Sequence, residues 1–277
     1  MPTLKEIKGR IASVRSTLKI TSAMKLVSSA KLRKAQNAIE AMRPYREKLA
    51  DILAAVMPSV PGDVALELLS ARQQAGGKVL VIAISSNSSL CGGFNSAVIA
   101  KTAEVLAANP GADLWPVGRK IADAFKKAGY PAAADRSVLA EHPSYDAAAD
   151  MVEQAMSYSD VYLVYNHFVS TSRQVPVCEP LYSADDFKVD EDALTPDIII
   201  EPSPAELIRS LYPKVLKLKA YTALLDSNAA EHAARTVAMQ TATDNGENLL
   251  QELTLQYNKG RQQKITSEIL DLAGAQA

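Results

Sequence analysis

Both ends of the chain repeat apolar residues at the spacing of an α-helix. Close to the N-terminus the intervals between apolar residues alternate between three and four, which is typical of a coiled-coil seam rather than of a broad core face. The residues of this first seam are Leu4, Ile7, Ile11, Val14 and Leu18. After a shift of phase the pattern continues to Val56, and Pro58 then ends it. The pattern predicts one amphipathic helix within residues 1–57.

Local signals place the start of this helix and one irregularity inside it. Thr3 and Glu6 have the S/T-x-x-E spacing of a capping box, in which each side chain satisfies a backbone N–H of the other residue. Pro44 lies within the helix and removes one backbone hydrogen bond. We therefore expect a kink at Pro44 rather than a helix end.

The last third of the chain predicts a still longer helix. No proline follows Pro213, and the only glycines between Lys214 and Ala273 are Gly246 and Gly260. Apolar or small side chains recur along this stretch at helical spacing, at Ala230, Ala234, Val237, Ala242, Leu249, Leu253, Tyr257, Ile265 and Ile269. A shorter helix capped by Ser203 should precede it, and we expect Pro213 to kink or interrupt that helix.

Each of the two long helices can cover the apolar stripe of the other. A helix over residues 214–273 would be about 90 Å long, whereas a domain built from the middle of the chain is only about 40 Å across. The helix must therefore project, and its apolar stripe needs a cover, because most helical stability in proteins comes from packing. The N-terminal helix is of similar length, so the sequence predicts an antiparallel two-helix coiled coil.

The middle of the chain alternates strand and helix signals. Lys78–Ile84 is a continuous apolar run, which suits a buried parallel strand. Helices are expected at 96–108, 119–128 and 145–158, a second strand at 112–117, antiparallel strands at 160–170 and 172–183, and a short edge strand at 198–200. The predicted fold class is α/β: a doubly wound, Rossmann-like central domain with an antiparallel edge, plus the coiled coil. The expected division is 1–57, 58–203 and 204–277.

Charge is unevenly spread although the formal net charge is only −1. Residues 1–57 carry 12 Lys and Arg against four Asp and Glu, a net +8, whereas residues 58–203 carry 10 against 19, a net −9. The basic side chains of the first helix are either a solvated face or the surface of a rod inside an acidic protein sleeve. Nucleic acid is a weaker choice, because no aromatic residues are interleaved with the charges.

We find no catalytic, cofactor-binding or metal-binding pattern in the sequence. The loop Ser85–Asn95 follows the first strand, where a nucleotide fold holds phosphate, but it contains neither GxGxxG nor GxxxxGK. A tight turn with positive φ is the better explanation for Gly92 and Gly93. Cys91 and Cys178 form no CxxC pair, and a buried thiol without function is expected at Cys91.

Five motifs resemble the gamma subunit of F-type ATP synthases, in that family's order. They are KITSAMKLVSSAK (19–31), SLCGGFN (89–95), VYNHF (164–168), EHAARTVAMQTATDNG (231–246) and LQYNKGRQQKITSEILDL (255–272). The resemblance implies a central rotor shaft that couples proton-driven rotation of a ring of c subunits to ATP synthesis or hydrolysis in a surrounding hexamer. Catalysis would belong to the beta subunits, so this chain would carry no catalytic site and need no cofactor.

The resemblance also implies partners and a location. The partners are the alpha and beta subunits, the epsilon subunit and the c ring, with no nucleic acid and no homo-oligomer. The expected location is peripheral, on the cytoplasmic face of the bacterial plasma (inner) membrane, with membrane contact only through the complex.

Subunit-interface residues are carried over by motif position. Met24 and Lys25 match positions near the beta-subunit loops that the shaft pushes. Arg261, Gln262 and Thr266 match positions that contact the hexamer near the top of the shaft. Asp244, with Asn245 and Gly246, matches the mid-helix signature, in which Gly246 lets the first helix approach closely.

The chain departs from the family pattern at three places: the loop before Cys91, the spacing before Gly274, and Gly260, where an alanine is usual. Two other functions remain alternatives: a coiled-coil scaffold or adaptor with a degenerate nucleotide fold, and a small-molecule enzyme that uses the 85–95 loop.

Overall fold

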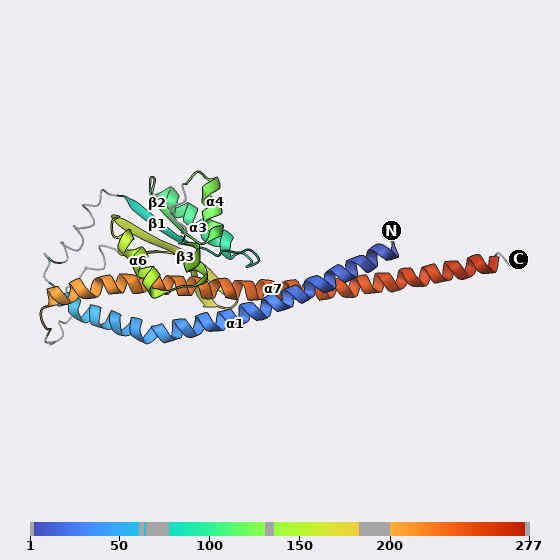
Figure 1. Ribbon diagram of the computed structural model, residues 1–277, viewed down its shortest axis with the longest axis horizontal. Coiled ribbons are helices and arrows are strands. Elements are labelled where there is room, and N and C mark those ends of the chain that lie inside the picture. The colour runs from blue at the N-terminus through green and yellow to red at the C-terminus, as the bar shows by residue number, and fades with distance from the viewer. Residues whose placement is uncertain (1–2, 61–63, 65–77, 131–135, 183–199, 275–277) are drawn as a thin grey trace. The chain divides into compact units, whose positions relative to one another are not determined.

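The computed structural model describes residues 3–60, 64, 78–130, 136–182 and 200–274 (Figure 1). By its contacts the chain divides into two compact units: unit 1 comprises Met1–Ser29 and Arg235–Ala277, and unit 2 comprises Ala30–Ala234. Helices α1 (Leu4–Val56) and α7 (Pro204–Gly274) contribute residues to both units. The division into segments 1–57, 58–203 and 204–277 stays a prediction. The two compact units are defined by contacts in space, so they do not test boundaries along the chain.

Helix α1 begins where the capping box predicts. The backbone N–H of Thr3 donates to Glu6 Oε2 at 2.9 Å, and the N–H of Glu6 donates to Thr3 Oγ1 at 3.3 Å. Pro44 lies inside the helix, which continues to Val56 before the 3₁₀ turn η1 (Met57–Ser59). Both the extent of the helix and its end before Pro58 are confirmed.

Helix α7 is longer than the sequence led us to expect. Its start is capped as predicted, since the N–H of Glu206 donates to Ser203 Oγ at 3.2 Å and Pro204 is the first helical residue. We expected Pro213 to kink or interrupt the helix; the interruption is wrong, because α7 runs through Pro213, and the kink stays a prediction. Tyr212 and Leu216 on either side are buried in the core of unit 2, and this packing outweighs the hydrogen bond that proline removes.

The sheet has four strands in the order β2-β1-β3-β4. Strand β1 (Val79–Ile84) is parallel to β2 (Asp113–Val117) on one side and to β3 (Asp160–Ser170) on the other. Strand β4 (Arg173–Pro180) pairs antiparallel with β3 at the edge. The doubly wound sheet with an antiparallel edge is therefore confirmed.

Helices cover both faces of this sheet (Figure 1). Side chains of β1 alternate between two cores: one contains α3 (Phe94–Ala108) and α4 (Arg119–Lys127), and the other contains α6 (Tyr145–Ala155) and residues of α7. Burial on both faces explains why β1 is apolar at every position.

Two differences from the predicted elements concern short segments. Helix α5 (Ser137–Glu141) was not expected, because five residues are too few to display a helical period. Helix α6 ends at Ala155 rather than at Tyr158. The expected edge strand at 198–200 lies almost entirely outside the described residues.

Candidate subunit interface

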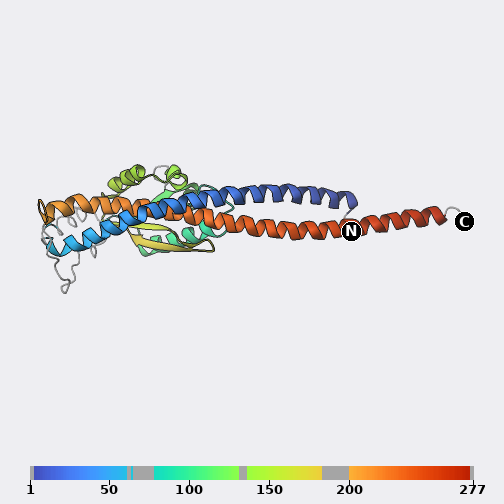
Figure 2. The same cartoon turned by 90° about the horizontal axis from the view of Figure 1, so that it is seen from below.

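In unit 1 the two helices form an antiparallel pair. Residue numbers rise along α7 as they fall along α1, and Figures 1 and 2 both show the two helices side by side in this unit. The contacting pairs are Leu4 with Gly260, Leu18 with Gly246, Thr21 with Thr243, and Lys25 with Gln240. The predicted antiparallel coiled coil is confirmed for this unit.

Gly246 allows the closest of these approaches. A Cβ atom added to Gly246 would lie 2.7 Å from Leu18 Cδ2, which is shorter than a van der Waals contact. Gly260 is similar but less tight, since its Cβ would lie 3.1 Å from Leu4 Cδ2. A Cβ atom at Gly246 would require the end of the Leu18 side chain to move, so this glycine lets the first helix approach closely, as predicted.

A buried hydrogen bond between two hydroxyl groups crosses the same interface. Thr21 Oγ1 and Thr243 Oγ1 lie 2.9 Å apart, and both residues are buried. Each hydroxyl also donates to a carbonyl of its own helix, Thr21 to Leu18 at 3.2 Å and Thr243 to Met239 at 2.8 Å. The contact between the two hydroxyls therefore adds a polar interaction across the helix pair that this register provides.

Much of the apolar surface of unit 1 is not covered by the helix pair. Its exposed large apolar side chains are Ile20, Leu26, Val27, Val237, Leu249, Leu255, Ile265, Ile269 and Leu270. Exposed basic side chains lie along the same part of α1, at Lys5, Lys8, Arg10, Arg15 and Lys19. A surface that combines many apolar side chains with positive charge is typical of a protein-binding surface.

Helix α7 extends past the start of α1. Leu4, the first residue of α1, lies against Gly260, whereas α7 continues to Gly274. The part of α7 after Gly260 is about 20 Å long at 1.5 Å per residue. All residues from Arg261 to Leu270 are exposed, with Ile269 and Leu270 exposed by 60% and 65%. This segment therefore has an apolar side without a partner among the described residues.

The structure places three of the predicted interface residues in one part of this unit. Met24 and Lys25 are half-buried on α1, and Lys25 Nζ donates to Gln240 Oε1 at 2.9 Å. Gln240 Nε2 in turn donates to Asp244 Oδ1 at 2.7 Å. Lys25 and Asp244 thus belong to one polar chain across the helix pair, through Gln240. Sequence reasoning missed Gln240, although its spacing of four from Asp244 on a helix was a usable signal.

The other three predicted interface residues lie in the segment of α7 beyond α1. Arg261, Gln262 and Thr266 are all exposed, and the Thr266 hydroxyl donates to the Gln262 carbonyl oxygen at 3.0 Å. The structure does not bring them near Met24, Lys25 or Asp244, so the six residues form two separate groups.

The loop after β1 in unit 2 satisfies its own polar groups. Asn95 Nδ2 donates to Ser86 Oγ at 2.9 Å and lies 3.2 Å from Cys91 Sγ, while Asn95 Oδ1 accepts from the Ser86 N–H at 3.1 Å. Cys91 is buried, as expected. Gly92 has a positive φ of 56°, but Gly93 has a φ of −82°, so the expectation of positive φ is correct only for Gly92.

The described part of the chain contains neither a metal-binding cluster nor a membrane-spanning helix. No group of three or more His, Cys, Asp and Glu side chains in it is arranged to hold a metal ion. None of its helices has a stretch that is both long and apolar enough to span a bilayer.

Comparison with known proteins gives concordant matches. The family profile described as ATP synthase matches residues 3–277. The ATP synthase gamma chain of Phocaeicola vulgatus is 46% identical over 288 aligned residues, covering 99% of each chain. That of Flavobacterium johnsoniae is 40% identical, covering 99% of this chain and 98% of the relative.

Among solved structures, the Euglena gracilis mitochondrial ATP synthase rotor resembles this fold with a TM-score of 0.68 at 20% identity, covering 95% of this chain and 98% of that chain. The central stalk and c-ring structure of the Tetrahymena thermophila mitochondrial ATP synthase matches with a TM-score of 0.56 at 22% identity, covering 80% of this chain and 99% of that chain.

Proposed function

We infer the function from the family: the chain belongs to the ATP synthase gamma chains, as its motifs indicated. We propose that it is the central rotor shaft of an F-type ATP synthase. In this role it couples proton-driven rotation of the c ring to ATP synthesis or hydrolysis in the alpha/beta hexamer. The observation that carries the proposal is the match to curated gamma chains over nearly the whole of both sequences.

The packing of unit 1 suits a part that transmits torque. A two-helix shaft resists twisting only if its helices neither slide nor separate. The close approach of Gly246 to Leu18 and the buried Thr21–Thr243 hydrogen bond both oppose such movement. The exposed surface of the pair, with its apolar and basic side chains, is then available to surrounding subunits.

The two groups of interface residues receive separate roles in this proposal. Met24 and Lys25 contact the beta-subunit loops that the shaft pushes during rotation. Asp244, which is joined to Lys25 through Gln240, belongs to the same interface. Arg261, Gln262 and Thr266, on the segment of α7 beyond α1, contact the hexamer near the top of the shaft. Exposed polar side chains suit a moving contact, because their interactions with a partner exchange readily with water.

The partners of the chain in this proposal are one hexamer of alpha and beta subunits, the epsilon subunit and the c ring. Nucleic acid and a second copy of the chain are not among them. The chain is a peripheral protein on the cytoplasmic face of the bacterial plasma (inner) membrane and reaches the bilayer only through the complex. Catalysis takes place in the beta subunits.

Gentle purification of this chain from its native membranes, followed by intact-mass measurement and subunit counting, tests the proposal. We expect one copy of the chain with three pairs of larger nucleotide-binding subunits in a complex that hydrolyses ATP. Recovery of the chain alone, or with unrelated proteins, would instead support the scaffold or adaptor alternative. Nucleotide binding by the isolated chain at micromolar concentration would revive the enzyme alternative.

A further inference from the structure

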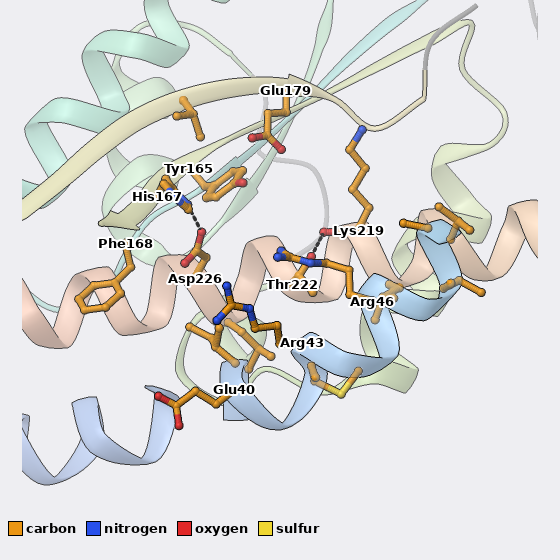
Figure 3. A pocket seen from close by; sticks show the side chains of 18 of the residues that line it. Glu40, Arg43, Arg46, Tyr165, His167, Phe168, Glu179, Lys219, Thr222 and Asp226 are labelled. Carbon is orange, nitrogen blue, oxygen red and sulfur yellow. Dashed lines mark hydrogen bonds and ion pairs between the residues drawn. The ribbon is translucent and has the colours of Figure 1, made fainter. Parts of the chain in front are cut away.

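Unit 2 contains a cavity that the rotor function does not use. It has a volume of about 580 Å³ and lies between α1, the β3–β4 hairpin and the first half of α7 (Figure 3). Cavities that hold small organic ligands usually have volumes of about 300 to 1,000 Å³ and mostly apolar walls with a few polar groups. The size of this cavity therefore suits a small molecule.

One side of the cavity is apolar. The side chains that form it come from all three elements: Met42, Leu49, Leu53, Val177, Val215 and Leu218. Leu49 and Leu218 belong to a small core cluster against which Met42, Leu53 and Val215 pack, so these side chains hold one another in place. An aliphatic chain or ring in contact with these side chains would lose its water shell at little cost in protein rearrangement.

The acidic groups on the sheet side are already satisfied from within the protein. His167 Nδ1 is hydrogen-bonded to the Asp226 carboxylate, and this contact joins β3 and α7 (Figure 3). The pKa of Asp226 is raised by burial, although His167, the backbone N–H of Phe168 and the positive charge of Arg46 oppose this shift. Burial also raises the pKa of Tyr165, and the nearby charge of Glu179 adds to the effect. An incoming cation would therefore gain little from these groups.

The basic groups on the α1 side are less fully paired. Arg43 Nε bonds Glu47 Oε1 at 3.1 Å, on the exposed surface of the helix. Within the described ranges Arg46 forms no hydrogen bond or ion pair. The two arginines are three residues apart, so they lie on one face of α1. Figure 3 shows their guanidinium groups extending toward the part of the cavity where Thr222 and Asp226 lie.

We propose that this cavity binds an anionic amphiphile: a single-chain carboxylate whose head lies at Arg46 and Arg43 and whose chain lies along the apolar wall. A guanidinium group donates two parallel hydrogen bonds to a carboxylate, so Arg46 supplies both charge and direction. The ligand would bridge α1, α7 and the sheet, and hence stabilise unit 2. The inference concerns unit 2 alone and does not depend on the rotor function.

The purified full-length chain provides the test. Sodium dodecanoate is titrated below its micellar concentration and followed by calorimetry and by the thermal unfolding midpoint. Dodecyltrimethylammonium is the matched cation. We expect one dodecanoate bound per chain and a raised unfolding midpoint. The cation should bind at least about tenfold more weakly, because the positive charges of Arg43 and Arg46 repel its head group.

Two variants of cavity residues and one control variant locate the site. Arg46→Gln should weaken dodecanoate binding by about tenfold or more, because it removes the charged donor. Arg33→Gln, at an exposed arginine of α1 that does not line the cavity, should leave binding unchanged. Leu53→Trp should abolish binding by filling the cavity, and binding of Arg46→Gln still reports on the site if Leu53→Trp fails to fold.

Equal binding of the cation, equal loss in Arg33→Gln, or no saturable binding below the micellar concentration would each overturn the proposal. A further result would assign the cavity to a protein instead. If dodecanoate does not bind, and amides of residues 39–53 become protected from hydrogen exchange when the other synthase subunits are added, then a neighbouring subunit fills it.

Discussion

Gly246 of α7 lies so close to Leu18 of α1 that a Cβ atom on Gly246 would stand 2.7 Å from Leu18 Cδ2. Gly246→Leu should therefore force the two helices apart and lower the free energy of unfolding by about 1–3 kcal/mol through overpacking. Chemical denaturation of the full chain measures this loss. Gly9→Leu is the matched control: a Cβ there meets nothing within 4 Å, so the better helix former should stabilise by about 0.5–1 kcal/mol. Unchanged stability and normal assembly of Gly246→Leu would count against the interface.

The Thr21–Thr243 hydrogen bond predicts a non-additive pair of substitutions. Thr243→Val removes one hydroxyl group and leaves Thr21 without its partner across the interface, so we expect a loss of about 1–2 kcal/mol in unfolding free energy. The double variant Thr21→Val/Thr243→Val should lose less than the sum of the two single variants, because the hydrogen bond that joins the two helices is removed only once. Strictly additive losses in the double-mutant cycle would show that the two hydroxyl groups do not act together.

Gly118 is required at the start of α4 for two reasons that experiment can separate. It has a φ of 102°, and a Cβ atom there would lie 2.3 Å from the carbonyl oxygen of Ser85. Gly118→Ala should destabilise unit 2 by more than about 3 kcal/mol, since both backbone strain and a backbone clash arise. Gly129→Ala, at a φ of 88° with nothing within 4 Å, carries the strain alone and should cost only about 1–2 kcal/mol. Similar losses in the two variants would rule out a role for the contact with Ser85.

Burial at Asp226 predicts a particular dependence of stability on pH. The pKa of Asp226 is raised above its ordinary value of 3.8, chiefly by burial and against the opposing effect of His167. The folded chain therefore binds this proton more tightly than the unfolded chain, so this group's contribution to stability falls as the pH rises from 3.8 through the raised pKa. The Asp226→Asn variant has no carboxyl group at this position, so its stability does not include that fall with rising pH. The stability of Asp226→Asn relative to the natural chain should increase over this interval and then level off, as measured by denaturation at a series of pH values. A constant or decreasing difference would contradict the raised pKa.

Met24→Lys tests the proposed contact with the beta subunits. Met24 is half-buried at the surface of the helix pair, and a lysine there can extend its charge into water, so folding should be retained. We expect ATP-driven proton pumping by the assembled complex to fall several-fold, because a new charge stands beside the loops that the shaft pushes. Ala41→Lys, at an exposed position of α1 outside unit 1, is the control. Normal pumping by Met24→Lys would disprove this contact.

Local sequence patterns were sufficient to predict most of the helices and strands. The capping box of Thr3 and Glu6 and the cap at Ser203 are interactions between residues three apart, so they are readable along the chain and appear as predicted. The continuous apolar run of β1 correctly indicated a strand that is buried on both faces of the sheet. The failures had different origins: α5 is too short to show a period, whereas tertiary packing in the core of unit 2 overrode the helix-breaking tendency of Pro213.

The sequence by itself thus determined the two long helices, the doubly wound sheet with its antiparallel edge, and the family. Only the tertiary structure decided which residues come together: Gly246 with Leu18, Lys25 with Asp244 through Gln240, and Arg46 with Asp226 in the lining of one cavity. The physical reason is the range of the interactions. A hydrophobic period identifies the face of a helix that will be buried. It does not identify the residues that bury it, because those contacts join positions up to hundreds of residues apart and depend on side-chain fit.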